Sequence, residues 1–395
     1  MAEDTDWKAA REWVSFSAAN TGFVGLGLEQ VQRVASLARS NIRAQVSQFS
    51  DGMYNVVFRV RFEDGVEWIC RIHKNDIEVS PACVKAKVES TVATMRYVKQ
   101  QIHSFPIPTI FAFESNPIIS SIDYAYILME AMSGTEVGQS GILDSDDESA
   151  VYDQLAVITW QLSTLCLPLI GRLYQSEDSK FYVGPFVDAQ GKSHGPFSTS
   201  VEFFMYEAEK IPPRHTAWRS KSSNDEKVSI AVCELYNKAA SFLSDNDLGS
   251  FPLVHGDFDT HNALFQRGPD GNLQLSAILD WDSAHTGSWL EFSFFPAFLK
   301  IRWPSLEAGK YSPRVLEKIR RRQHIFLESL KQEEWKFGER TTNRPKDLYR
   351  IFDSPAVRVA EFILLYSNPY FECDKNLFSK YLHAWRSEVD WVAEM

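Results

Sequence analysis

The chain has 395 residues, and its 44% hydrophobic and 24% charged content is that of an ordinary globular protein, which excludes a largely disordered one. Its formal net charge of -11 argues against a nucleic-acid partner, and we interpret the one basic run, residues 318–322, as a solvated helix face. Five scattered cysteines without a CxxC pair predict free thiols and a cytoplasmic protein. No apolar run approaches the ~20 residues that span a bilayer, so we expect no membrane partner.

The first third of the sequence predicts a β-rich lobe with one long helix. Apolar and polar residues alternate on both sides of Asp64-Gly65, which predicts a hairpin, and Ser80-Pro81 is typical of a helix start. The predicted elements, in chain order, are a helix over 27–45, strands over 54–62 and 66–72, a helix over 80–101, and strands over 107–113 and 124–130.

After residue 131 the patterns become mainly helical. Capping boxes at 145–148 and 223–226 predict two helix starts. The later predicted elements are a hairpin of 263–266 and 273–281 and helices over 313–331, 354–366 and 375–393. A β-rich block followed by a helical remainder predicts an α+β fold with two lobes, residues 1–130 and 131–395.

The strongest chemical signal is the segment His255-Gly256-Asp257, followed by Asn262 and then Asp280. Phosphoryl transfer needs a carboxylate near the attacking hydroxyl and oxygen ligands that hold magnesium against the phosphates. Asp257 and Asn262 lie five residues apart on one predicted loop. Because a hairpin returns its end close to its start, Asp280 is predicted to lie beside Asn262, and an amide and a carboxylate oxygen then suit Mg²⁺.

These residues resemble the aminoglycoside phosphotransferase and choline kinase-like family, which has the protein-kinase-like fold, and in particular its fungal-type branch. The family's catalytic loop, HGDxxxxN, is matched by residues 255–262, and its magnesium segment by Leu279-Asp280-Trp281-Asp282. The resemblance implies a kinase that moves the γ-phosphate of ATP, or alternatively GTP, to a hydroxyl or amine of a small molecule. It names neither the acceptor nor an oligomeric state.

The resemblance also implies a role for each matching residue. Asp257 is the catalytic carboxylate, His255 braces its loop, and Asn262 and Asp280 bind Mg²⁺. Nucleotide-binding positions follow by the same matching: Gly52 and Asn55 in the turn over the phosphates, Arg71 as the phosphate-pairing cation positioned by Glu89, and Met129, Glu130 and Ala131 in the hinge that holds adenine.

Two departures from the family keep an alternative open. Arg71 stands where the family has lysine, and Lys74, the other candidate, is predicted to point to the opposite face of the strand. The turn at Gly52 is poor in glycine. The alternative is therefore a catalytically weak or inactive pseudokinase that serves as a nucleotide-binding scaffold. A protein kinase is disfavoured because no Ala-Pro-Glu segment follows Asp280.

The acceptor pocket is not identified by any motif. We interpret the aromatic run 289–295 as core packing more than as a pocket wall. Three acidic residues, Asp259, Asp282 and Glu291, would be available to bind a cationic acceptor, whereas the neighbouring aromatic residues would equally suit an apolar one.

Overall fold

The computed structural model describes residues 26–52, 54–74, 78–136, 145–209, 249–296, 299–300, 312–337, 345–352 and 357. The helix predicted to start at 223–226 and the helices predicted over 354–366 and 375–393 lie outside these residues, apart from Val357.

The first lobe is built on a five-stranded antiparallel sheet in the order β1-β2-β3-β5-β4. Its elements are α2 (Leu28–Ala38), β1 (Ala44–Asp51), β2 (Asn55–Phe62), β3 (Glu67–His73), β4 (Ile110–Glu114) and β5 (Tyr126–Glu130). Alternate β2 side chains are buried and pack with Val31 and Val34 of α2, which gives this lobe its own hydrophobic core.

The leading helix is shorter than predicted, and the strand that follows it was missed. The helix ends at Ala38, and Ser40 and Asn41 then adopt left-handed backbone conformations, with φ of 53° and 63°, which a helix cannot continue through. Residues 44–51 form β1, in which an irregularity between Gln48 and Ser50 breaks the alternation that would mark a strand in the sequence.

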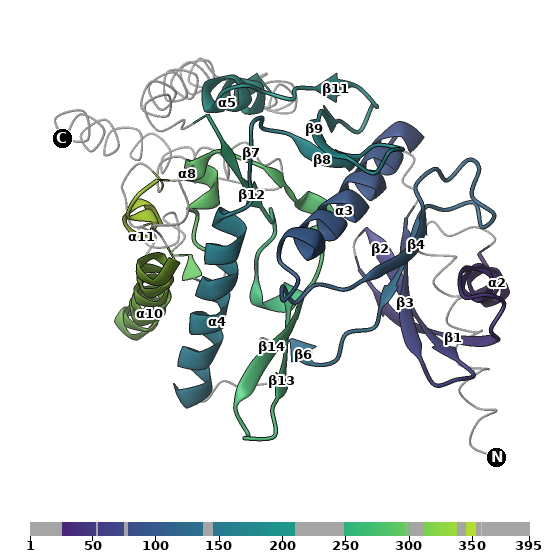
Figure 1. Cartoon of the computed structure of the whole chain (residues 1–395), viewed down its shortest axis with the longest axis horizontal. Coiled ribbons are helices and arrows are strands. Elements are labelled where there is room, and N and C mark those ends of the chain that lie inside the picture. The colour runs from purple at the N-terminus through teal and green to yellow at the C-terminus, as the bar shows by residue number, and fades with distance from the viewer. Residues whose placement is uncertain are drawn as a thin grey trace.

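The long helix α3 (Pro81–Gln101) begins where predicted, at Ser80, whose Oγ accepts the Cys83 N–H at 3.2 Å. Its buried residues, such as Val88 and Val92, belong to the core of the second lobe rather than to that of the first sheet. The helix packs mainly against β8 (Arg172–Gln175) and residues 281–283 of the second lobe and also contacts β4 and β5 of the first sheet, so it connects the two lobes (Figure 1).

The second lobe combines helices with several short strands. Its described elements are β6 (Thr135–Glu136), α4 (Ser145–Ser163), β7 (Cys166–Leu167), β8 (Arg172–Gln175), β9 (Phe181–Gly184), β10 (Phe186–Val187), β11 (Ser193–His194), α5 (Ser200–Glu209), β12 (Phe251–Val254), β13 (Ala263–Arg267), β14 (Leu273–Ile278), β15 (His285–Thr286), α8 (Trp289–Phe292), α10 (Pro313–Phe337) and α11 (Leu348–Phe352). The helices α4 and α10 and the hairpin β13–β14 confirm predicted elements. The strands of two to four residues were not predicted, because they are too short for a period-two pattern.

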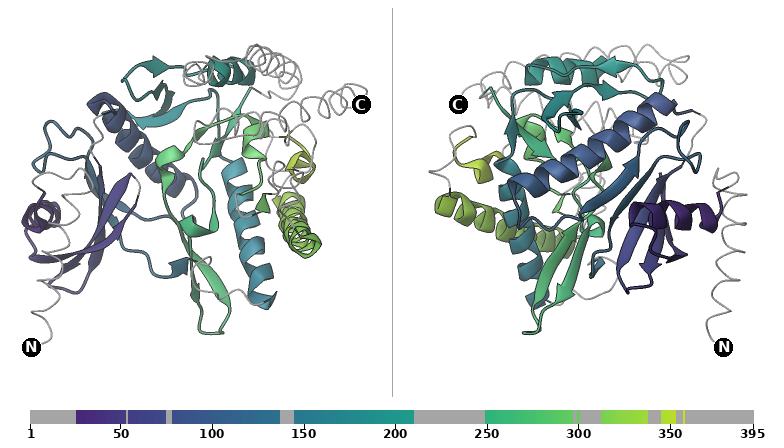
Figure 2. Two further views of the ribbon diagram at one scale, coloured as in Figure 1. Left: turned by 180° about the vertical axis from the view of Figure 1, so that it is seen from behind. Right: turned by 45° about the vertical axis from the view of Figure 1, so that its right-hand side comes forward.

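Helices α4 and α10 pack together at the side of the lobe remote from the first sheet (Figure 2). Part of the basic run of residues 318–322 lies in this contact, because Ile319 is buried and Arg322 donates to Glu148 of α4 at 2.7 Å. The interpretation as a solvated face therefore holds only for the exposed Lys318, Arg320 and Arg321, and even Lys318 lies 3.5 Å from Glu148.

The two lobes form the predicted α+β, protein-kinase-like arrangement, with a small sheet-based lobe beside a larger one that carries most of the helices. The boundary near residue 130 stays a prediction. None of the helices in the described ranges is both long enough and apolar enough to traverse a lipid bilayer. Cys70 and Cys83 are free thiols, and Cys233 and Cys373 lie outside the described residues.

Candidate active site

The loop between β12 and β13 is fixed to the end of β14 by a buried histidine. His255 donates from Nε2 to the Leu279 carbonyl oxygen at 2.9 Å, and its Nδ1 accepts the Asp257 N–H at 3.3 Å. Gly256 has φ of +80°, and a Cβ there would lie 2.4 Å from the Ser283 carbonyl oxygen, so only glycine allows this approach. The loop and the segment after β14 are thus held as one unit.

Burial lowers the pKa of His255 to about 4, so its imidazole is neutral near pH 7. In the unfolded chain the His255 imidazole becomes protonated near pH 6.5, whereas in the native protein it stays neutral down to about pH 4. The stability that depends on neutral His255 is therefore complete above pH 6.5 and is lost as the pH falls, by ~1.4 kcal/mol per pH unit.

His255→Gln, which keeps a donor and an acceptor but cannot titrate, is expected to show a shallower loss of stability in acid. Between pH 7 and pH 5, urea unfolding should lower the free energy of unfolding by ~2 kcal/mol less in the variant than in the wild type. Equal pH profiles for the two proteins would contradict the neutral, buried state of His255.

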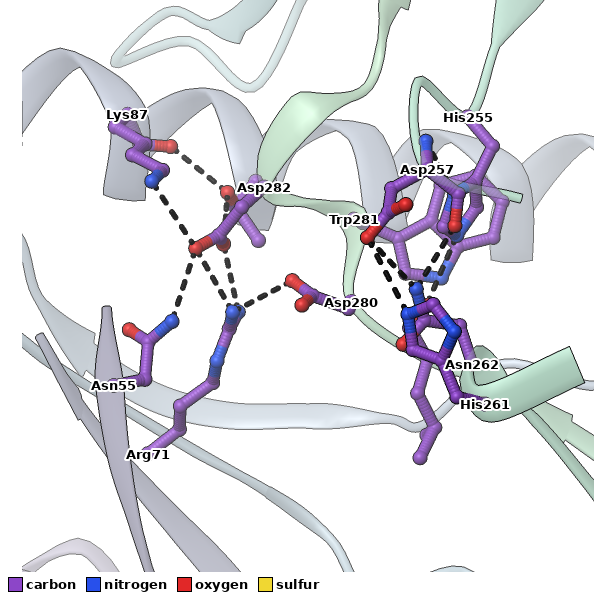
Figure 3. A network of polar contacts seen from close by, with 12 residues as sticks. Asn55, Arg71, Lys87, His255, Asp257, His261, Asn262, Asp280, Trp281 and Asp282 are labelled. Carbon is purple, nitrogen blue, oxygen red and sulfur yellow. Dashed lines mark hydrogen bonds and ion pairs between the residues drawn. The ribbon is translucent and has the colours of Figure 1, made fainter. Parts of the chain in front are cut away.

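Asp257 and Asn262 face each other across the loop (Figure 3). The amide Nδ2 of Asn262 donates to the carbonyl oxygen of Asp257 at 2.8 Å and to its Oδ2 at 3.1 Å, while the Asp257 side chain is 50% exposed. The Leu279 N–H donates to the Asn262 carbonyl oxygen at 2.7 Å, and Ala263 pairs with Ile278. The hairpin therefore returns Asp280 to the neighbourhood of Asn262, as the sequence predicts.

The donor set around Asp280 fits a hard cation. Asp280 has a left-handed backbone conformation, with φ of 59°, and its carboxylate is 42% exposed. Because Nδ2 of Asn262 is engaged with Asp257, the amide oxygen is the atom left for a metal. Among the described residues no group of three or more His, Cys, Asp or Glu side chains is placed to hold a metal ion. The side-chain oxygens of Asn262 and Asp280 are of the hard type that Mg²⁺ prefers.

Arg71 reaches from β3 across to both aspartates of the Asp280-Trp281-Asp282 segment. Its Nη1 lies 2.7 Å from Asp282 Oδ1, its Nη2 lies 2.8 Å from Asp282 Oδ2, and the same Nη2 lies 2.7 Å from Asp280 Oδ1. The pair with Asp282 is bidentate, and both side chains are only 12% exposed. The guanidinium is thus anchored beside the predicted magnesium ligand (Figure 3).

The expected pairing of Arg71 with Glu89 is absent, and this expectation was wrong. Glu89 Oε1 accepts from Ser115 Oγ at 3.0 Å and lies 3.8 Å from Lys85 Nζ. The reason is the phase of α3. Lys87 lies two residues before Glu89 and hence about 200° around the helix, so when Lys87 faces the aspartates, Glu89 points away.

Asp282 is the centre of a buried polar network that the sequence reasoning did not identify. Besides Arg71, it accepts from Thr91 Oγ1 at 3.0 Å and from Asn55 Nδ2 at 3.3 Å, and Lys87 Nζ lies 3.6 Å away. Burial alone would raise the pKa of Asp282, but Arg71 and Lys87 outweigh it and hold this pKa well below its usual value. One anionic carboxylate thereby joins β2, β3 and α3 to the segment that follows β14.

A signal for part of this network was present in the sequence. Lys87 and Thr91 are four residues apart on a predicted helix and so share one face. Two further neighbours of the site were not given a role: Arg172 Nη1 donates to the Asp282 carbonyl oxygen at 2.7 Å, and His261 Nε2 lies 3.7 Å from Asp257 Oδ2. No local pattern distinguishes these two from ordinary surface or packing residues.

The turn between β1 and β2 is closed by the Gly52 N–H, which donates to the Asn55 carbonyl oxygen at 2.9 Å. Met53 in this turn lies outside the described residues. Lys74 Nζ lies 2.5 Å from Asp51 Oδ1, so Lys74 is paired at the turn while Arg71 is paired with the aspartates. The roles of Gly52 and Asn55 toward phosphate stay predictions.

The predicted hinge lies at the end of β5. The Glu130 N–H donates to the Thr109 carbonyl oxygen at 2.9 Å, and Glu130 Oε2 accepts the Thr109 N–H at 3.0 Å. The backbone N–H of Glu130 is therefore already hydrogen-bonded within the protein. Contacts of Met129, Glu130 and Ala131 with adenine stay predictions.

The model of a phosphotransferase enzyme family matches residues 45–291 of the chain, which include every residue of the site described above. No curated protein matches the chain. Similar solved structures include the streptomycin–ATP–APH(2")-IIa ternary complex (12% identity, TM-score 0.46, covering 90% of this chain and 99% of that one). ADP-bound aminoglycoside phosphotransferase APH(2'')-Ib has 14% identity and a TM-score of 0.44, with 84% and 98% coverage. Macrolide 2'-phosphotransferase MphH from Brachybacterium faecium, as the apoenzyme, has 15% identity and a TM-score of 0.40, with 88% and 100% coverage.

Proposed function

Since the chain belongs to the phosphotransferase enzyme family, we propose that it transfers the γ-phosphate of ATP, or alternatively GTP, to a hydroxyl or amine of a small molecule, with Mg²⁺ as cofactor. The observation that carries the proposal is the convergence of Asp257, Asn262 and Asp280 through the hairpin β13–β14. A carboxylate that is free to meet an acceptor thus lies next to oxygen donors suited to a metal.

In the proposed reaction the acceptor oxygen or nitrogen forms a bond to the γ-phosphorus, and the bond between that phosphorus and the bridging oxygen of ADP breaks. Asp257 orients the acceptor and takes its proton, since its carboxylate is half exposed and its Oδ2 is held by Asn262. His255 does not exchange protons near pH 7, because burial lowers its pKa to about 4, so its part is to hold the loop.

Asn262 and Asp280 would hold the metal. Mg²⁺ would neutralise the charge of the phosphate oxygens. Arg71 supplies a permanent cation at the same place, and its bidentate bond to Asp282 fixes the direction from which it meets the phosphates. Because Arg71 Nη2 also binds Asp280 Oδ1, we expect this one contact to be exchanged for metal and phosphate when the nucleotide binds.

Thermal unfolding with nucleotide tests this proposal. Millimolar ATP or GTP is expected to raise the Tm only when Mg²⁺ is present, because Asp280 would hold a metal that neutralises the phosphate charge. Asp280→Ala should abolish that dependence. As a matched control, Asp178→Ala, which removes an exposed carboxylate on the turn between β8 and β9, should respond as the wild type does.

Two results would count against the proposal. If neither nucleotide raises the Tm with Mg²⁺, the assigned nucleotide site is wrong. If nucleotide and Mg²⁺ stabilise the protein but ADP or GDP never forms with any acceptor, the chain is the nucleotide-binding scaffold that is the alternative.

A further inference from the structure

A cavity of about 170 Å³ opens beside Asp257 in the described part of the chain, and phenylalanine rings contribute to its wall beside polar residues such as Glu291 and Lys300. Phenylalanines from three segments line it: Phe258 from the loop of Asp257, Phe292, Phe294 and Phe295 at and after α8, and Phe352 from α11. From the sequence, we interpreted the aromatic run 289–295 as core packing more than as a pocket wall. Trp289 and Phe292 are indeed buried, but Phe294 and Phe295 are only half buried and face this cavity.

We infer that this cavity receives the acceptor, and that the acceptor is an uncharged alcohol whose apolar body is about the size of one aromatic ring. The inference rests on the proposed function and deepens it, because it assigns a substrate class to the site that Asp257 serves. Three observations support it: the size of the cavity, the nature of its wall, and the pairing of the nearby acidic residues.

The size and the wall suit one ring. An apolar cavity of roughly 150 Å³ is enough to bind benzene. The rings already present meet edge to face or tilted, with centroid distances of 5.8 Å for Phe295–Phe352 and 6.2 Å for Phe295–Phe326. Aromatic rings prefer these arrangements, so a further ring can pack against the same walls. Since Asp257 lines the same cavity, a hydroxyl on the bound molecule would lie near this residue.

A polycationic acceptor would need unpaired acidic groups, and at least one carboxylate oxygen of each of the three candidate acids is already engaged, while Oε2 of Glu291 has no hydrogen-bond partner among the described residues. Asp282 is neutralised by Arg71 and Lys87. Asp259 accepts the Thr260 N–H at 2.6 Å through Oδ1, and its Oδ2 lies 3.3 Å from His261 Nδ1. The contacts of these two acids therefore disfavour the alternative in which they bind a cationic acceptor.

The third acid, Glu291, is paired with a buried histidine. His285 Nε2 lies 2.9 Å from Glu291 Oε1. Burial lowers the pKa of His285, but the Glu291 carboxylate outweighs this and raises that pKa above its usual value, which favours a positively charged imidazole beside the carboxylate. Lys300, whose Nζ lies 5.7 Å from the centre of the Phe294 ring, adds a positive charge to the cavity wall. The contact between Glu291 Oε1 and His285 disfavours a second cation at that oxygen.

Binding measured without nucleotide tests the inference, with 2-phenylethanol as the neutral probe and kanamycin as the polycation. Isothermal titration calorimetry and ligand-observed NMR should show saturable, millimolar binding of 2-phenylethanol and weaker or no binding of kanamycin. Phe294→Ala should weaken the binding of 2-phenylethanol by about tenfold, because it removes part of the apolar wall. Phe337→Ala, at an exposed site on α10 outside the cavity wall, is the matched control and should leave the affinity unchanged.

If Phe294→Ala does not fold, Phe258→Ala from another wall of the same cavity takes its place, with the same expected loss. Tighter binding of kanamycin, no binding of 2-phenylethanol, or equal affinities in the wall variants and the control would overturn the inference. The outcome is separate from that of the proposed function. If ADP forms from ATP with kanamycin as the only effective acceptor, the proposed phosphotransferase function stands and the inference about the cavity is overturned. If the cavity variants weaken binding of 2-phenylethanol but nucleotide and Mg²⁺ do not change the Tm, the inference stands and the proposed function is overturned.

Discussion

Asp257→Asn is expected to lower the turnover number for phosphate transfer by ~10²–10⁴-fold while leaving the thermal shift by ATP and Mg²⁺ unchanged. Asparagine keeps the size of the side chain and can still meet Asn262, but it cannot take the acceptor's proton. The metal and phosphate contacts are assigned to other residues, so nucleotide binding should persist. Steady-state release of ADP, measured beside the thermal shift, checks both halves of the expectation.

Asp259→Asn is the matched control for this variant. Asp259 lies on the same loop, but it accepts the Thr260 N–H and neighbours His261, and it is not assigned to the reaction. Its turnover should stay within a few-fold of the wild type. Full turnover by Asp257→Asn, or an equal loss in both variants, would show that Asp257 is not the base.

The second large effect is expected on stability, from Asp282→Ala. Asp282 balances the buried Arg71 and the nearby Lys87, and removing one partner of such a buried pair leaves an uncompensated charge. That change typically costs ~3–5 kcal/mol in the free energy of unfolding. Urea unfolding of the variant should therefore show a midpoint well below that of the wild type.

A double-mutant cycle separates the ion pair from simple loss of packing. Arg71→Met and Asp282→Asn should each destabilise the protein, and the double variant should lose clearly less than the sum of the two. The exposed pair of Lys180 and Asp178 serves as the comparison, and Asp178→Ala should leave the unfolding curve close to that of the wild type. Strict additivity of Arg71→Met and Asp282→Asn would contradict the network around Asp282.

The convergence of Asp257, Asn262 and Asp280 could be predicted from the sequence because every step in it is local. A loop of eight residues carries the first two, and a hairpin with a recognisable turn returns the third. The lengths of the two hairpin strands determine that Asp280 lies beside the start of the hairpin, so its position can be predicted without knowledge of the rest of the fold.

The partner of Arg71 could not be predicted in the same way. It depends on how α3 is rotated about its axis relative to β3, and this rotation is set by packing against β8 and the segment 281–283 rather than by the helix sequence. The strand β1 was missed for a different reason, because its irregularity near Gln48 breaks the alternation. The cavity wall combines residues that are nearly 100 positions apart, from Phe258 to Phe352, which no local pattern relates.

Phosphorus NMR of ATP and Mg²⁺ mixed with the protein and a panel of alcohols and amines is the most direct test of the phosphotransferase assignment. For the wild type we expect the γ-phosphate signal of ATP to be replaced by the signals of ADP and of a new phosphorylated acceptor, and we expect neither change with Asp280→Ala. An unchanged spectrum from wild-type protein that nonetheless binds nucleotide and Mg²⁺, across the whole panel, would contradict it.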